Sequence, residues 1–99
     1  MEIKILESAK QDLLSGYSFY ESKRKGLGNY FINSLFADIE SLILYAGVHQ
    51  KFFGFYRMLS RRFPYAIYYK FKKDRNEVII YAVLDCRRNP KKLEKRLKS

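Results

Sequence analysis

The apolar positions in the first half of the chain recur at helical spacing, in two blocks. Leu13, Tyr17 and Tyr20 follow one another at steps of four and three, which predicts a helix from Ala9 to about Lys25. A second stripe predicts another helix; it consists of Phe31, Leu35, Ile39, Leu42, Ile43 and Ala46. We therefore expect a helical hairpin with an apolar stripe on each arm.

Small and polar residues mark the expected ends of these helices. Ser8 has the position of an N-cap, with Gln11 at capping-box spacing. Gly26-Leu27-Gly28 interrupts the first helix, and Asn29 is then the expected cap of the second. Gly47 suits the left-handed residue that ends a helix.

The period shortens to that of strands in the second half of the chain. Residues 53–63 alternate roughly between apolar and polar, and Tyr65–Phe71 places its odd-numbered residues on one face. The polar residues 72–77 predict a hairpin loop, and the almost wholly apolar Val78–Leu84 is typical of a central strand. A short strand candidate, Ile3–Leu6, also precedes the first helix.

The end of the chain predicts one more short helix. Asn89 and Pro90 read as its N-cap and first residue, and Leu93 and Leu97 share a face that could dock on the sheet. The fold class is therefore α+β, with an N-terminal strand and a helical hairpin packed on one face of a small, mostly antiparallel sheet, and a short C-terminal helix. We expect a single domain spanning residues 1–99.

Composition favours a soluble, globular and cytoplasmic protein. Hydrophobic residues make up 47% and charged residues 30%, and no apolar run approaches the roughly 18 residues of a membrane span. The first ten residues mix charges with apolar side chains and lack the core of a signal peptide. We expect no contact with a membrane.

Positive charge is concentrated in the second half. Residues 1–49 contain five Lys/Arg and six Asp/Glu, whereas residues 50–99 contain fifteen and four. Two arginine pairs, Arg61-Arg62 and Arg87-Arg88, flank the two strongest strand candidates. Antiparallel pairing brings all four to one end of the sheet, where they would repel one another without an anionic partner. That partner could be RNA, DNA or an acidic protein.

Few side chains offer enzyme chemistry. His49 is the only histidine and Cys86 the only cysteine, and neither has an expected catalytic neighbour. We expect no metal site and no cofactor. Arg57, inside an alternating strand, is either buried and paired or placed on a functional face. For each of the tyrosines in the strands, packing is favoured over a direct role; these are Tyr65, Tyr68, Tyr69 and Tyr81.

Several segments together resemble the RelE/ParE superfamily of bacterial type II toxins. They span nearly the whole chain and keep the family's order: Asp12-Leu13, Gly26-Leu27-Gly28, Phe31, Leu35, Arg57, Arg62-Phe63-Pro64-Tyr65, Ile67-Tyr68-Tyr69, Ala82-Val83-Leu84 and Arg87-Arg88-Asn89-Pro90. The resemblance implies a helical hairpin against a twisted antiparallel sheet. It also implies a cognate acidic antitoxin as partner, and a target that is either DNA gyrase, as in ParE-like members, or mRNA on the ribosome, as in RelE-like members.

The residues favour the ParE-like branch. RelE-like nucleases carry an arginine near the position of Ala66 and often a tyrosine or histidine near the C-terminus, which residues 89–99 lack. A gyrase poison would dock through Arg61, Arg62, Arg87 and Arg88. The alternatives are a ribosome-dependent mRNA endonuclease and an inactive antitoxin-binding relative. As a nuclease, the chain would hold the scissile phosphate and move protons with Arg57, Arg62, Arg87, Tyr68 and Lys70.

Overall fold

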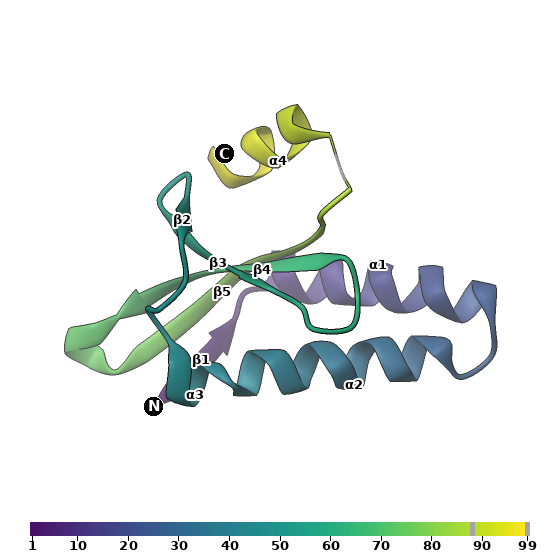
Figure 1. Cartoon of the computed structure of the whole chain (residues 1–99), viewed down its shortest axis with the longest axis horizontal. Helices are drawn as coiled ribbons and strands as arrows, with labels where there is room; N and C mark the ends of the chain where they lie inside the picture. The colour runs from purple at the N-terminus through teal and green to yellow at the C-terminus, as the bar shows by residue number, and fades with distance from the viewer. Residues whose placement is uncertain (88, 99) are drawn as a thin grey trace.

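The computed structural model describes residues 1–87 and 89–98 as one sheet with helices on both of its faces (Figure 1). In chain order the elements are β1 (Glu2–Ile5), α1 (Glu7–Lys23), α2 (Leu27–Glu40), α3 (Leu42–Tyr45), β2 (Lys51–Phe52), β3 (Phe55–Leu59), β4 (Tyr65–Lys72), a 3-10 turn (Lys73–Arg75), β5 (Glu77–Asp85) and α4 (Pro90–Lys98).

The sheet has the strand order β1-β5-β4-β3-β2. Strand β1 runs parallel to β5, and the other three pairs are antiparallel. The predicted α+β class and mostly antiparallel sheet are confirmed. The longest pairing joins β4 and β5, where Tyr65 stands opposite Asp85 and Lys72 opposite Glu77. Strand β5 lies inside the sheet, as its apolar sequence predicts.

Helices α1 and α2 cover one face of the sheet. Their predicted stripes supply Leu13, Phe31, Leu35 and Ile39 to a core that also contains Ile67, Tyr69, Val78 and Ile80 of the strands. The two helices approach closely at Gly16, where an added methyl group would overlap the ring of Phe31. Phe31 is fully buried, so this contact locks the hairpin to the core.

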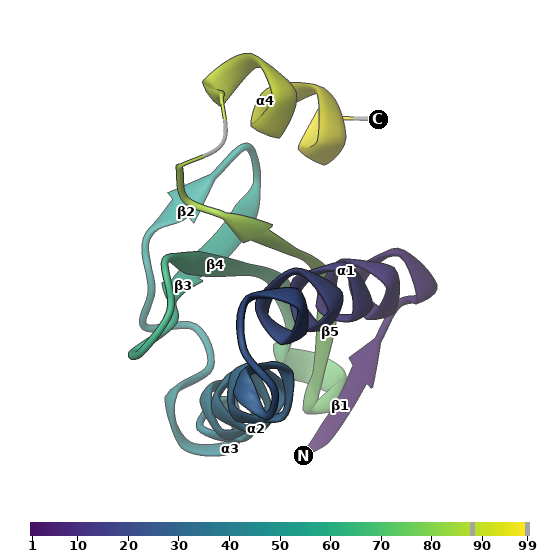
Figure 2. The same cartoon turned by 90° about the vertical axis from the view of Figure 1, so that its right-hand side faces the viewer.

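Helix α4 lies on the opposite face (Figure 2). Leu97 is buried there in a second cluster, together with Phe55, Ala66, Tyr68, Ala82 and Leu84. The predicted docking of this helix on the sheet is confirmed, but it does not share a face with the other two. Asn89 caps α4, because its side-chain oxygen accepts a hydrogen bond of 2.8 Å from the backbone N–H of Lys91.

The start of α1 differs from the prediction. The helix begins at Glu7, and the predicted cap Ser8 lies within its first turn. The Ser8 hydroxyl instead donates to the backbone carbonyl of Tyr81, at 3.1 Å. The side chain of Ser8, which the local spacing predicts as the helix cap, therefore binds β5 instead.

The start of α2 also differs. Leu27 begins the helix after Gly26, which has the left-handed φ of 90°, and Asn29 lies inside the helix. The carboxylate of Glu21 accepts hydrogen bonds from the backbone N–H groups of Gly26 and Gly28, at 2.9 to 3.1 Å. A side chain from the preceding helix thus replaces the predicted asparagine cap.

The second predicted helix is interrupted at Ser41. Its hydroxyl donates to the carbonyl of Asp38 one turn back, a bond that bends helices, and the chain continues as the short α3. Gly47 ends this region with φ of 92°, as predicted. Strand β3 ends at Leu59, earlier than the predicted residue 63. None of the helices in the described part of the chain has the length and apolar character needed to cross a lipid bilayer.

Substitution of Gly16 tests the helix contact. Although alanine is the better helix former by about 1 kcal/mol, we expect Gly16→Ala to lower the free energy of unfolding by about 1–3 kcal/mol, because the methyl group overpacks against Phe31. Urea unfolding measures this. Ser15→Ala, at an exposed position of the same helix, is the control, and Phe31→Leu should partly rescue Gly16→Ala. A stabilised Gly16→Ala variant would contradict the close packing.

Candidate functional site

The loop between β3 and β4 and the end of β5 meet at one end of the sheet. The backbone N–H of Cys86 donates to the carbonyl of Pro64, at 2.7 Å, and joins the two segments. Arg61 and Arg62 are exposed on the loop, and Arg87 follows β5. The predicted gathering of arginine-bearing segments is present for these three residues, while Arg88 lies outside the described residues.

The loop that carries Arg61 and Arg62 is fixed to α2 by a buried carboxylate. Asp38 is only 6% exposed. Its Oδ2 accepts hydrogen bonds from the Ser60 hydroxyl, at 2.7 Å, and from the backbone N–H of Arg61, at 3.3 Å. The backbone of this arginine loop (residues 60–64) is therefore held in place while its two guanidinium groups point outside the core.

An aromatic side chain anchors the same loop from below. The ring of Phe63 packs against Tyr20, Tyr30 and Phe31, with centroids 4.8, 5.4 and 5.1 Å away. Such edge-to-face contacts add to the burial of the ring. The loop is consequently preorganised, and binding through it would cost little conformational entropy.

Arg87 lies beside α1 and is paired with Asp85. Its Nε and Nη2 atoms donate to the two carboxylate oxygens of Asp85, at 3.0 and 2.8 Å. These bonds raise the pKa of the Arg87 guanidinium above its ordinary value. The pair lines a pocket of about 370 Å³ with Phe19 and Tyr65. Burial raises the pKa of the neighbouring Tyr20, and Arg87 partly opposes this shift.

Arg57 lies on the other side of the sheet, beneath α4. Its Nε donates to the Tyr68 hydroxyl, at 3.2 Å, Nη2 lies 3.9 Å from Cys86 Sγ, and the guanidinium stands 4.9 Å from the centroid of Phe52. Arg57 is half-buried and paired. The sequence left open whether Arg57 is buried and paired or lies on a functional face. In the structure Arg57 is paired, but part of its side chain is still exposed.

Lys70 shares this face with Arg57. Its ammonium lies 4.9 Å from the ring of Phe55 and 5.4 Å from that of Tyr81. The packing role favoured for the tyrosines is confirmed for the three that are buried, which are Tyr65, Tyr68 and Tyr69. Of the five nuclease candidates, the structure thus gathers Arg57, Tyr68 and Lys70, and places Arg62 and Arg87 elsewhere.

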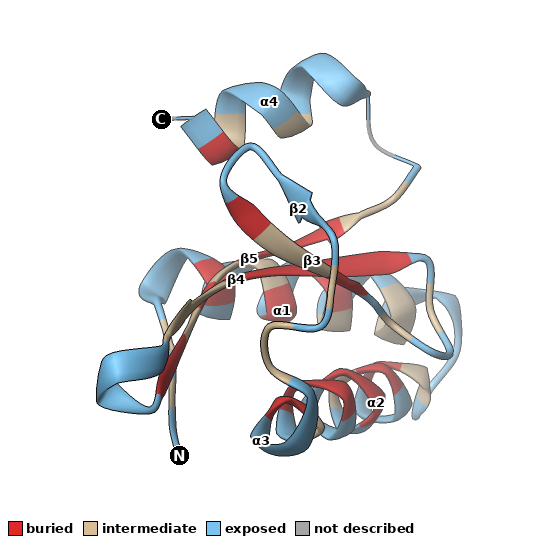
Figure 3. Ribbon diagram, turned by 60° about the vertical axis from the view of Figure 1, so that its left-hand side comes forward, coloured by how far each residue is buried: buried red, intermediate tan, exposed pale blue. Residues whose placement is uncertain are grey.

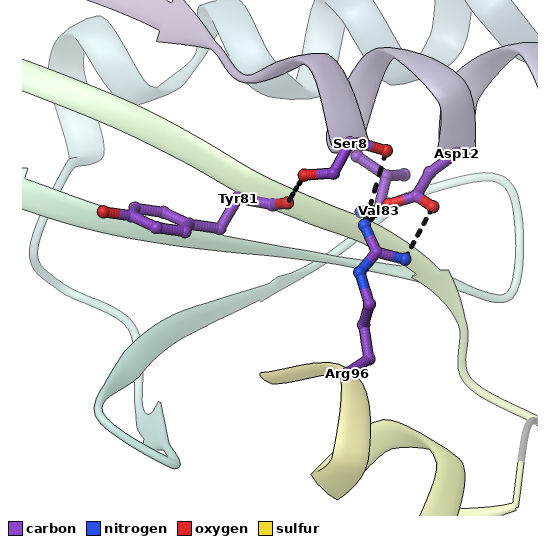
Figure 4. A network of polar contacts seen from close by, with 5 residues as sticks. All are labelled: Ser8, Asp12, Tyr81, Val83 and Arg96. Carbon is purple, nitrogen blue, oxygen red and sulfur yellow. Dashed lines mark hydrogen bonds and ion pairs between the residues drawn. The ribbon is translucent and has the colours of Figure 1, made fainter. Parts of the chain in front are cut away.

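A polar network that the sequence analysis missed connects α4 to α1 (Figure 4). Arg96 donates to both carboxylate oxygens of Asp12, at 2.8 and 2.7 Å, and to the carbonyl of Ser8, at 3.3 Å. Asp12 also accepts from the backbone N–H of Val83 on β5, at 2.9 Å. The sequence analysis named Asp12 only as part of the family resemblance. No local sequence pattern predicts its pairing with Arg96.

His49 is attached to the sheet. Its Nδ1 lies 2.5 Å from the hydroxyl of Tyr69, which also accepts from the backbone N–H of Gly47, at 3.0 Å. Because the Tyr69 oxygen accepts from Gly47, its O–H can donate to Nδ1 of a neutral His49. Burial lowers the pKa of His49 below its usual range. These contacts give the only histidine a structural role.

Comparison with known proteins identifies the fold. No family model matches the sequence, and no curated protein matches it. A chain of the solved structure described as the chromosomal ParDE toxin–antitoxin system from P. aeruginosa is similar in structure, with a TM-score of 0.73 and 17% sequence identity. The match covers 84% of this chain and 92% of that chain. The chain therefore shares its fold with a chain of that ParDE system. The resemblance found in the sequence is thereby confirmed at the level of the fold.

Substitution of Arg96 tests the attachment of α4 to the rest of the domain. Arg96→Met keeps an apolar stem but leaves the Asp12 carboxylate, 13% exposed, without its cation. We expect a loss of about 1.5–3 kcal/mol in the free energy of unfolding, and faster amide hydrogen exchange in α4. Lys95→Met, at an exposed position of the same helix, is the matched control. Equal exchange rates in the two variants would contradict the anchoring role.

The stability of the protein should depend on pH through His49. Its pKa is lowered in the folded state, so its contribution is fully present above the unfolded value of about 6.5 and is lost as the pH falls through the folded value. Urea unfolding between pH 8 and 5.5 measures the slope. His49→Asn, which offers an acceptor near Nδ1 but does not titrate, should flatten it. An unchanged slope would assign the pH dependence to other groups.

Proposed function

We propose that this chain is the toxin of a type II toxin–antitoxin module, a ParE-like growth inhibitor that acts on DNA gyrase and is neutralised by an acidic antitoxin. The observation that carries the proposal is the likeness of fold to a chain of a ParDE system over 84% of the sequence. In this reading the domain of residues 1–99 is the toxin itself, it works in the cytoplasm, and it needs no cofactor.

The arginine loop supports the proposal of a partner with a large anionic surface, which is either a protein or DNA held by a protein. Arg61 and Arg62 are exposed, and the backbone between them is fixed by Asp38 and Phe63. Two guanidinium groups on a rigid loop suit carboxylates of a protein or phosphates of DNA held by a protein. Arg87 and Arg88 are proposed to extend this docking surface.

The separation of the nuclease candidates supports docking over RNA cleavage. A scissile phosphate must contact its arginine clamps and its proton carriers together. Arg87 is bound to Asp85 and faces α1, whereas Tyr68 lies on the α4 face and is only 3% exposed. A proton carrier so covered has poor access to a substrate.

A RelE-like mRNA endonuclease is the second candidate. It is favoured by the gathering of Arg57, Tyr68 and Lys70 on one face of the sheet, with Arg57 Nε 3.2 Å from the Tyr68 hydroxyl. An inactive relative that only binds an antitoxin is the third.

Two reactions with the purified chain separate these functions. We expect inhibition of gyrase supercoiling and trapped DNA cleavage, and intact mRNA in a reconstituted translation reaction mapped by primer extension. Arg61→Ala/Arg62→Ala should weaken gyrase inhibition by about tenfold or more. The control is Lys72→Ala/Lys73→Ala, which removes the same charge at the far end of β4.

Ribosome-dependent cuts at A-site codons would overturn the gyrase assignment and establish the nuclease. Inactivity in both reactions would support the inactive relative. Equal inhibition by the two double variants would remove the arginine loop from the docking surface.

A further inference from the structure

Large apolar side chains are concentrated on the surface between α3 and the β2–β3 turn. Six of them lie in residues 43–53, here called the edge segment: Ile43, Leu44, Tyr45, Val48, Phe52 and Phe53, all 41–79% exposed. Leu44 and Val48 are the most exposed, at 79% and 72%. Figure 3 shows this segment passing from the layer of α2 toward that of α4, coloured largely as exposed. Six large apolar side chains exposed within eleven residues exceed the scattered single ones that are normal on a protein surface, and such a concentration typically marks a protein interface.

The edge segment is held firmly from its inner side. The backbone N–H of Gly47 and the ring of His49 bind the Tyr69 hydroxyl, and the backbone N–H of Arg57 donates to the carbonyl of Gln50, at 2.8 Å. Tyr69 itself is fully buried. The apolar side chains therefore face outward on a fixed backbone, and their exposure does not come from a loose loop.

The tip of the β2–β3 hairpin displays an aromatic ring at an energetic cost. Phe53 has φ of 53° and Gly54 has φ of 84°. A two-residue turn with positive φ at both positions ordinarily carries asparagine or aspartate before the glycine. Phenylalanine is unfavourable there, yet the residue is 45% exposed, and its ring lies 5.5 Å from the ammonium of Lys98 on α4. A strained residue that presents its side chain to solvent points to a binding role.

Charge selects the partner. Residues 41–58 contain Lys51 and Arg57 and no Asp or Glu, and the Lys98 ammonium lies 5.5 Å from the ring centroid of Phe53. A second copy of the chain, with a net charge of +10, would be repelled. Nucleic acid bases stack on aromatic rings, whereas aliphatic Leu44 and Val48 offer them no such platform. An acidic protein with apolar side chains satisfies both the charge and the apolar surface.

A second apolar groove lies between α1 and α2 and gives a useful contrast. It has a volume of about 440 Å³ and is lined by Leu14, Tyr17, Ile32 and Phe36 among others. Lys10 is the one charged residue in its described lining, whereas Arg57 and Lys98 lie against Phe52 and Phe53 at the hairpin end of the edge segment. An acidic partner is therefore drawn to the edge segment and not to this groove.

We infer that the edge segment is the surface on which the apolar side chains of the acidic antitoxin dock. This inference rests on the proposed function, because it assigns a place to the partner that the function requires. Leu44 and Val48 fill the centre of the contact. The basic residues at its hairpin end orient the acidic chain; they are Lys51, Arg57 and Lys98. The contact lies on a different part of the molecule from the arginine loop, so it need not share residues with target docking.

Affinity measurements with matched variants test the docking. The probe is the product of any short acidic reading frame that adjoins this gene, titrated by calorimetry against the full chain. We expect Leu44→Glu and Val48→Glu to weaken binding by about tenfold or more each, and Leu44→Gln to weaken it less. Leu14→Glu is the control, with the same change at a leucine 55% exposed in the other groove, and should bind normally. Thermal unfolding confirms that each variant is folded.

The outcomes separate this inference from the proposed function. Normal binding by both Leu44→Glu and Val48→Glu would overturn the docking site and leave the antitoxin partnership intact; loss of binding in Leu14→Glu alone would move the site to the helical groove. Absence of binding by the unsubstituted chain would count against the proposed function itself. Sedimentation adds one test: a dimer of the chain that Leu44→Glu dissociates would make a second copy the occupant.

Discussion

The carboxylate of Asp12 connects three elements that are distant in sequence. Strand β1 pairs with β5 only as far as Ile80, so the rest of that edge of β5 needs other partners. Asp12 accepts the backbone N–H of Val83, and Ser8 donates to the carbonyl of Tyr81. The same carboxylate holds Arg96 of α4. Two side chains of α1 thus complete the edge of the sheet, and one of them, Asp12, also holds the C-terminal helix.

This dependence makes the two faces of the sheet unequal. The α1–α2 face is closed by a continuous apolar core that includes Phe31, Leu35 and Tyr69. The α4 face has a smaller cluster and a nine-residue helix that would be marginal alone. Charged side chains such as Arg57 and Lys70 therefore remain partly accessible on this second face, which the smaller core does not fill.

The helical stripes, the alternation in β4 and the cap at Asn89 could be predicted because each depends on neighbours in the sequence. The predictions for Ser8 and Asn29 are wrong because a more distant partner overrides the local preference, whereas the second helix is interrupted by a local bond from the Ser41 hydroxyl to the carbonyl of Asp38. Ser8 bonds to β5, and Glu21 caps α2. The face of the sheet on which α4 packs depends on the ion pair between Arg96 and Asp12. Residue spacing in the sequence does not predict this pair.

The candidate site shows the same division. Strand register brings the segments of Arg61, Arg62 and Arg87 to one end, and this was foreseeable from the hairpin. The direction in which each arginine side chain points could not be predicted, because it depends on the nearest carboxylate. Arg87 turns to Asp85, while Asp38 binds only the backbone of Arg61 and leaves its guanidinium free of that contact. The charge of Arg87 is thus balanced by Asp85 within the chain, although its side chain is still 62% exposed, whereas the guanidinium of Arg61 receives no such balance from Asp38.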